Sequence, residues 1–227
     1  MNKHLLCVLS ACVLACGTIS ACGDDQPALP APYGEVAIGA SFIPSVHTDT
    51  YTINFEGNTA TGHIDLNYKT GFTGTAELGY AGIFSPDLRL GVAYDIVDAV
   101  FSNGLITGTV NGVPASLSFT KADANAVGIN LSNTVNMFSG QAYYSLPLVW
   151  QFRPYIGVGA GAAIIEHAST EPAFTATAGF RSGIAGSAYW GIRYRFYWIN
   201  GPKDDLGIRY QAITNHSVMV VFGTYFD

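Results

Sequence analysis

The sequence predicts an all-β protein that forms an eight-stranded antiparallel up-and-down transmembrane β-barrel. Segments of about ten residues alternate with a period of two between apolar residues and small or polar ones. Only 11% of the 227 residues are charged, against about 25% in typical soluble proteins. After the N-terminal segment no run of about 18 apolar residues occurs, so the sequence does not predict a membrane-spanning helix.

Residues 1–22 form the first element, a predicted signal peptide. Lys3 precedes the apolar stretch LLCVLSACVLAC, and small residues follow in GTISAC. The run from Ile19 to Cys22 resembles the lipobox of bacterial lipoproteins, in which cleavage precedes a lipidated cysteine. Lipidation of Cys22 and ordinary cleavage near Ala21 or Gly23 both remain open. All 4 cysteines lie in this segment, so the exported chain has neither a disulfide framework nor a thiolate metal site.

The next elements are a flexible tether at residues 23–32 (GDDQPALPAP) and a barrel at residues 33–227. An even number of strands is the rule for bacterial barrels of this kind. We expect eight, at residues 34–45, 72–83, 88–101, 134–148, 155–168, 181–196, 206–213 and 216–226.

Alternation within these strands predicts which side chains face lipid. In residues 88–97 (LRLGVAYDIV), leucine, valine, tyrosine and isoleucine side chains share one face, and arginine, glycine, alanine, aspartate and valine the other. Residues 190–196 (WGIRYRF) repeat this division. A soluble sandwich would carry Lys, Glu, Ser and Thr on its second face, whereas here that face is mostly glycine and alanine with a few charges. This pattern is typical of a small barrel with a filled interior. A soluble lipocalin-like barrel is the rival, with aromatic residues inside and charges outside.

Unpaired charges inside a barrel cost several kcal/mol, so we expect the inward-facing charges to pair with one another. The predicted lumen network contains three acids and four bases: Glu35, Glu77, Asp95, Arg89, Arg193, Arg195 and Arg209. This near balance favours a packed polar lumen over an open pore of one charge.

Residues 153–167 (RPYIGVGAGAAIIEH) contain three alternating glycines, Gly157, Gly159 and Gly161. A phosphate-binding loop would need a G-x-G-x-x-G turn that opens a helix, or a Walker lysine, and neither occurs. The stretch therefore predicts a strand with small residues on its inner face.

Turn signals place short connections at 85–87, 152–154 and 200–203, whereas long connections fall at 46–71 and 102–133. Short periplasmic turns and longer extracellular loops are typical of outer-membrane barrels, with the N-terminus in the periplasm. Residues 102–133 form either a flexible solvated loop or a hairpin that extends the barrel wall beyond the membrane.

Four segments resemble the opacity-type outer-membrane β-barrel family of Gram-negative bacteria: PYIGVGAGAA (154–163), SAYWGIRYRF (187–196), DDLGIRYQ (204–211) and the final GTYF (223–226). The resemblance covers most of the mature chain and implies eight glycine- and aromatic-rich strands, but it identifies no activity. Family members end on an aromatic residue used in barrel assembly. Here Asp227 follows Phe226, and the resemblance implies that Phe226 is the assembly signal.

These observations predict a structural or surface-interaction role in the outer membrane, adhesin- or antigen-like and without catalysis. Its partners would be outer-membrane lipids, the barrel-assembly machinery and a host or extracellular ligand held by loops 46–71 and 102–133. A narrow porin-like channel is the first alternative, and an outer-membrane lipid-modifying enzyme is the second. In the strand at 216–226, His216 and Ser217 are adjacent and therefore point to opposite faces, which argues against a catalytic pair.

We expect no cofactor and no metal site, because the histidine spacings match no ligand motif. Without Lys3 the exported chain has 9 of the 10 basic residues against 16 acidic ones, a balance of −7. This acidic excess argues against nucleic acid as a partner.

Overall fold

A computed structural model describes residues 30–126, 133–146, 152–166, 168–203 and 208–226. The strands in this part of the chain are β1 (Ala31–Phe42), β2 (Val46–His47), β3 (Tyr51–Phe55), β4 (Asn58–Lys69), β5 (Gly71–Ala81), β6 (Leu88–Val110), β7 (Val113–Thr120), β8 (Asn133–Ser145), β9 (Arg153–Ile165), β10 (Thr170–Ala185), β11 (Ala188–Ile199) and β12 (Ile213–Tyr225). A short helix, α2 (Lys121–Ala126), follows β7. Of the helical segments in these ranges, none has the length and apolar composition of a membrane span.

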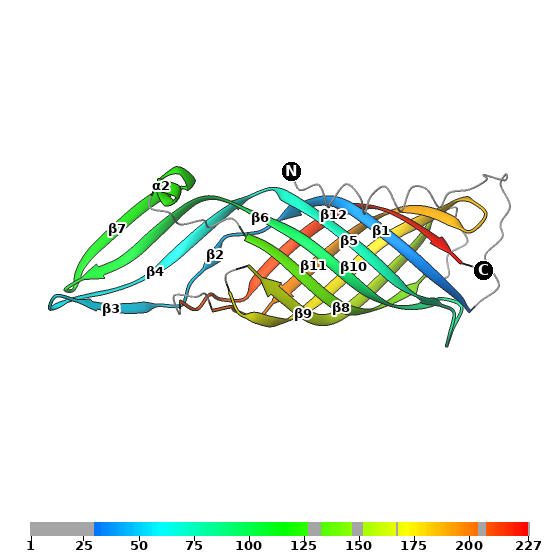
Figure 1. Ribbon diagram of the computed structural model, residues 1–227, viewed down its shortest axis with the longest axis horizontal. Coiled ribbons are helices and arrows are strands. Elements are labelled where there is room, and N and C mark those ends of the chain that lie inside the picture. Colours follow the sequence, from blue (N-terminus) through cyan, green and yellow to red (C-terminus); the bar gives the residue numbers. More distant parts are fainter. Residues whose placement is uncertain (1–29, 127–132, 147–151, 167, 204–207, 227) are drawn as a thin grey trace.

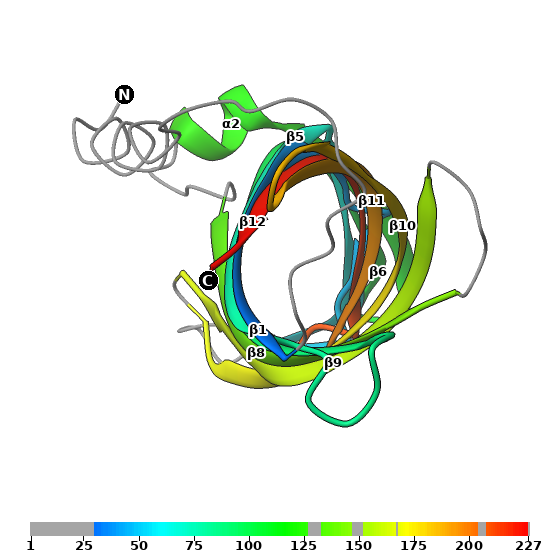
Figure 2. The same cartoon turned by 90° about the vertical axis from the view of Figure 1, so that its right-hand side faces the viewer.

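Eight strands close into a ring in the order β1, β5, β6, β8, β9, β10, β11, β12 and back to β1. Every pair is antiparallel, and Figure 2 shows the ring seen from one end. Closure leaves no free edge among these strands. The predicted eight-stranded antiparallel barrel is therefore confirmed.

Two of the eight predicted strands are wrong. The segment at 181–196 is not one strand, because the chain turns at Gly186 (φ 55°) between β10 and β11. The described residues 208–212 of the strand predicted at 206–213 belong to no barrel strand: Arg209 lies in an isolated bridge with Lys203, and only Ile213 is part of a strand, β12. The strand that was missed, β10, begins Thr-Glu-Pro-Ala, and its 16 residues include three threonines and four alanines, so its apolar–polar alternation is weak. The total remained eight because one omission and one false strand cancelled.

The turn predicted at 200–203 also lies at the wrong end of the barrel. The connections at 82–87 and 186–187, the start of β1 and the end of β12 define what we call the short-turn end. Asn200 follows the end of β11 that pairs with the start of β12, at the opposite, long-loop end.

Five strand segments form a second sheet that projects from the long-loop end (Figure 1). β6 runs for 23 residues, and its second half pairs with β4 on one side and β7 on the other, while β2 and β3 pair with β4. We call β2, β3, β4, β7 and the second half of β6 the protruding sheet. Both of its long hairpins turn through residues with positive φ, Glu56-Gly57 and Asn111-Gly112, as two-residue hairpin loops require. The hairpin alternative for residues 102–133 is therefore correct over its described part.

The barrel's outer surface is apolar. Leu78, Val92 and Val158 expose 63%, 68% and 64% of their surface, while their neighbours Glu77, Ala93 and Gly157 face inward. This division is that of a wall with lipid outside and a packed interior, as the alternation predicted. The signal peptide with Cys22 and most of the predicted tether lie outside the described residues.

Candidate functional site

Six of the seven predicted lumen charges meet inside the barrel, all of them buried: Glu35 on β1, Glu77 on β5, Arg89 and Asp95 on β6, and Arg193 and Arg195 on β11. They alternate in sign along one chain of ion pairs. Arg89 contacts Glu35 at 3.3 Å, and Arg193 contacts both Glu35 and, at 3.6 Å, Glu77. Arg195 then contacts Glu77 at 3.5 Å and Asp95 at 2.6 Å.

The strand register explains why Arg193 is central. Glu35 and Glu77 are direct cross-strand partners on β1 and β5, so two carboxylates face each other inside the barrel. Like charges in such positions repel each other. The Arg193 guanidinium, which comes from β11 across the lumen, contacts both carboxylates and compensates the repulsion.

Tyrosine hydroxyls complete the coordination of the carboxylates. Tyr33 and Tyr143 each donate to Glu77 at 2.6 Å. Tyr189 donates to Glu35 at 2.9 Å, and Tyr197 donates to Asp95 at 3.1 Å. The sequence interpretation placed aromatic residues toward lipid and missed this inner set. Strand parity could have found it, because Tyr33 lies two residues before Glu35 and Tyr197 two residues after Arg195.

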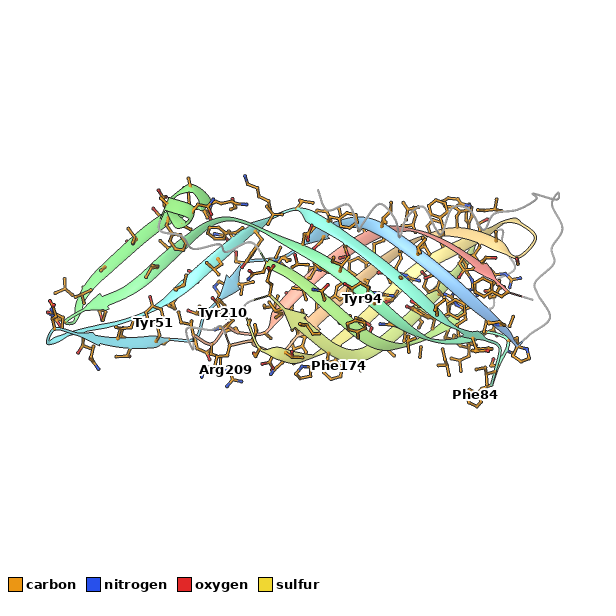
Figure 3. All side chains as sticks on the ribbon, viewed as in Figure 1. Tyr51, Phe84, Tyr94, Phe174, Arg209 and Tyr210 are labelled. Carbon is orange, nitrogen blue, oxygen red and sulfur yellow. The ribbon has the colours of Figure 1, made fainter. Side chains whose placement is uncertain are left out.

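The prediction that Arg209 is the seventh lumen charge is wrong. Its side chain is exposed, and it lies in the connection between β11 and β12 at the long-loop end (Figure 3). The fourth lumen arginine is instead Arg181 on β10, which is 8% exposed and donates to Ser145 Oγ at 2.9 Å. Alternation could have found it, because even within the strand predicted at 181–196 Arg181 has the same facing as Arg193 and Arg195.

The lumen is apolar toward the long-loop end. Val97, Val135, Met137, Ala163, Ile165, Ala173, Tyr197 and Ile199 form one buried cluster there. Next to this cluster, on the side of the short-turn end, lie large side chains with less than 2% exposure, among them Arg89, Arg193, Arg195, Tyr33 and Tyr143. The interior therefore consists of an apolar layer stacked on a charged, tyrosine-rich layer.

The protruding sheet continues the barrel wall, but its inner face is apolar and its outer face is polar, the reverse of the barrel wall. Asn67 pairs with Asn103 and Tyr68 with Phe101, so Ser102 is an extra residue that shifts the facing of β6 by one position. Beyond this bulge the inner face carries Tyr51, Ile53, Ala60, Gly62, Ile64, Leu66, Gly104, Ile106, Gly108, Val110, Val113, Ala115, Leu117 and Phe119. The outer face carries Thr52, Asn54, Thr59, Thr61, His63, Asp65, Asn67, Asn103, Thr107, Thr109, Pro114, Ser116 and Ser118, with Leu105 as its exposed apolar residue.

Part of this apolar face is packed and part is exposed. Near the barrel, Val46, Leu66 and Phe101 form a buried cluster against Phe119 and Tyr210. Toward the tips, Ile53, Val113 and Leu117 expose 54%, 66% and 61% of their surface. Figure 3 shows Tyr51 on the sheet, far from Phe84 at the short-turn end.

The residues considered for catalysis do not come together. Ser217 lies in the lumen with 0% exposure, whereas His216 lies on the outer side and contacts the Tyr194 hydroxyl at 2.6 Å.

His47 and His63 flank Asp65 on the outer face of the protruding sheet, at 2.6 and 3.8 Å. Within the described ranges, no group of three or more His, Cys, Asp or Glu residues is placed to hold a metal ion.

Phe226, the predicted assembly signal, follows β12 at the seam that closes the barrel. Its backbone N–H donates to the carbonyl of Pro32 at 2.9 Å, and its ring lies over Gly34 of β1. Its side chain is 46% exposed on the outer side.

Comparisons with known proteins agree with this architecture. The crystal structure of Neisserial surface protein A matches with a TM-score of 0.54 at 11% sequence identity, over 86% of this chain and 97% of that chain. The chain has the fold of an eight-stranded outer-membrane β-barrel. The outer-membrane protein OprG from Pseudomonas aeruginosa matches with a TM-score of 0.44 at 15% identity, over 87% and 97% of the two chains. No protein-family model and no curated protein sequence matches the chain. The likeness to Neisserial surface protein A confirms the eight-stranded barrel fold that the opacity-type resemblance implied.

Proposed function

We propose that this outer-membrane barrel is a surface-interaction protein of the adhesin or antigen type, without catalytic activity. The barrel anchors the protruding sheet, and the sheet contacts a host or other extracellular ligand through residues 46–71 and 102–126. The short-turn end and the N-terminus lie in the periplasm, because short turns face that side in barrels of this kind. Phe226 at the barrel seam engages the assembly machinery.

The apolar inner face of the protruding sheet is the observation that carries this proposal. Its exposed isoleucine, valine and leucine side chains lie on the sheet that projects beyond the eight-stranded ring (Figure 1). Apolar surface of this kind gains about 25 cal/mol for each Å² that a partner removes from water. Exposed apolar patches rimmed by polar residues are typical of interaction sites.

A hydrocarbon-adhesion assay on whole cells tests this function with hexadecane droplets as the probe. Substitution of Ile53, Val113 and Leu117 by threonine should reduce adhesion of the expressing cells at least about tenfold, because each side chain loses about 1 kcal/mol of burial on contact. The control replaces Thr107, Thr109 and Ser116 on the outer face by asparagine. Equal adhesion of the two triple variants would contradict the proposal, provided that both show the heat-dependent gel shift of a folded barrel.

The channel alternative makes a different prediction. Ion flow would need a continuous water path through both the Arg–Glu–Tyr layer and the apolar layer at the long-loop end. Both layers are made of buried side chains. We expect the purified protein to give no conductance steps in planar bilayers. Regular steps that change in size in an Arg195→Ala variant would instead establish a path through the lumen.

A further inference from the structure

The charges inside the barrel do not balance at the short-turn end. The described lumen holds three acids, Glu35, Glu77 and Asp95, and four arginines, of which Arg89, Arg193 and Arg195 belong to the ion-pair chain. The fourth is Arg181, for which the described residues provide no ion pair; its one side-chain hydrogen bond goes to the neutral Ser145. A buried guanidinium without a counter-charge is strongly unfavourable.

Arg89 and Arg181 approach the same tyrosine, so the Arg89 charge adds to the positive potential around Arg181. The two guanidinium carbons lie 6.0 and 5.7 Å from the centre of the same Tyr189 ring. The charge of Arg89 repels that of Arg181. Arg153 increases the effect, because the β9–β10 register places it directly opposite Arg181 at the rim of the barrel.

Both buried arginines, Arg89 and Arg181, also have N–H donors without a hydrogen-bond acceptor among the described residues. Nε and Nη2 of Arg89 and Nη1 of Arg181 are buried and find no hydrogen-bond acceptor among the described residues. The nearby carboxylate, Glu35, already accepts from Arg89 Nη1, Arg193 and Tyr189. A buried donor without an acceptor is costly, so an additional acceptor at this position would be stabilising.

We propose that the short-turn end of the lumen binds a small inorganic anion, with chloride as its physiological form, between Arg181 and Arg89. The anion supplies the missing negative charge and accepts hydrogen bonds from the free guanidinium groups. Tyr189 and Tyr225 form the walls of this site, since both rings pack against Arg181. The position next to the rim gives access from the short-turn end. This site is independent of the protruding sheet and its proposed function.

Thermal unfolding of the refolded protein in detergent, followed by its heat-dependent gel shift, tests the proposal. Sodium chloride is varied against sodium gluconate at constant ionic strength, so that general screening does not change. We expect the midpoint to rise by about 3–5 °C for each tenfold increase in chloride above the dissociation constant. The increase should vanish in Arg181→Gln and persist in Arg209→Gln, which removes an exposed arginine at the other end.

A crystal of the unmodified protein grown in sodium bromide keeps the proposal testable if Arg181→Gln does not fold. An anomalous bromide peak within hydrogen-bond distance of Arg181 and Arg89 is the expected result. A water molecule or a carboxylate of the chain itself at that position would overturn the proposal. Identical midpoints of the unmodified protein in chloride and gluconate, or a chloride effect that survives in Arg181→Gln, would also overturn it.

Discussion

Replacement of Arg193 by methionine should destabilise the barrel by about 3–5 kcal/mol, the cost of removing one partner of a buried ion pair. Methionine conserves much of the volume but leaves Glu35 and Glu77 facing each other across the β1–β5 ladder. It also removes the hydrogen bond from Arg193 Nε to the Tyr155 hydroxyl at 3.0 Å. Unfolding by urea in lipid vesicles, read from the heat-dependent gel shift, measures the change.

Two further variants distinguish this charge effect from a general loss of packing. Arg209→Met removes an exposed arginine and should change the unfolding free energy by less than about 0.5 kcal/mol. In the double variant Arg193→Met with Glu35→Gln, one of the two facing carboxylates is neutral, so part of the stability should return. A double variant as unstable as the sum of its single changes would show that Arg193 does not act by separating the two carboxylates.

Replacement of Gly161 by alanine should destabilise the barrel by about 1–3 kcal/mol, the usual cost of overpacking, or block its closure. A Cβ at Gly161 would overlap the carbonyl oxygen of Phe138 and lie 2.6 Å from the Cα of Ser139, both on the paired strand β8. Backbone atoms in a ladder cannot move aside as a flexible side chain can, so β8 and β9 would have to separate.

Gly140 provides the matched control. It lies on β8 and is exposed on the outer side, and an added Cβ would meet nothing within 4 Å. Gly140→Ala should therefore leave the urea midpoint close to that of the unmodified protein. Equal destabilisation by the two alanines would mean that glycine is needed for its backbone freedom in general and not for the close approach at Gly161.

The sequence by itself determined the fold class and most of the lumen network. Alternation with period two assigns each side chain to one face of the wall, because neighbouring side chains in a strand point in opposite directions. Six of the seven predicted charges followed from that rule, and so did the opposite facing of His216 and Ser217. The rule failed for Arg209, which alternates correctly but lies outside any barrel strand. Arg181 has the facing of Arg193 and Arg195, so the rule would have included it in the lumen set from which it was omitted.

Pairing between distant strands decided the remaining features. The contact of Arg193 with Glu35 and Glu77 depends on β11 lying across the lumen from β1 and β5, and no local pattern encodes that distance. The reversed polarity of the protruding sheet depends on one extra residue, Ser102, which becomes a bulge only when β4 pairs with β6. Local alternation determines which residues of one strand share a face. The register between strands determines which residues of different strands contact each other, and that register exists only in the closed barrel.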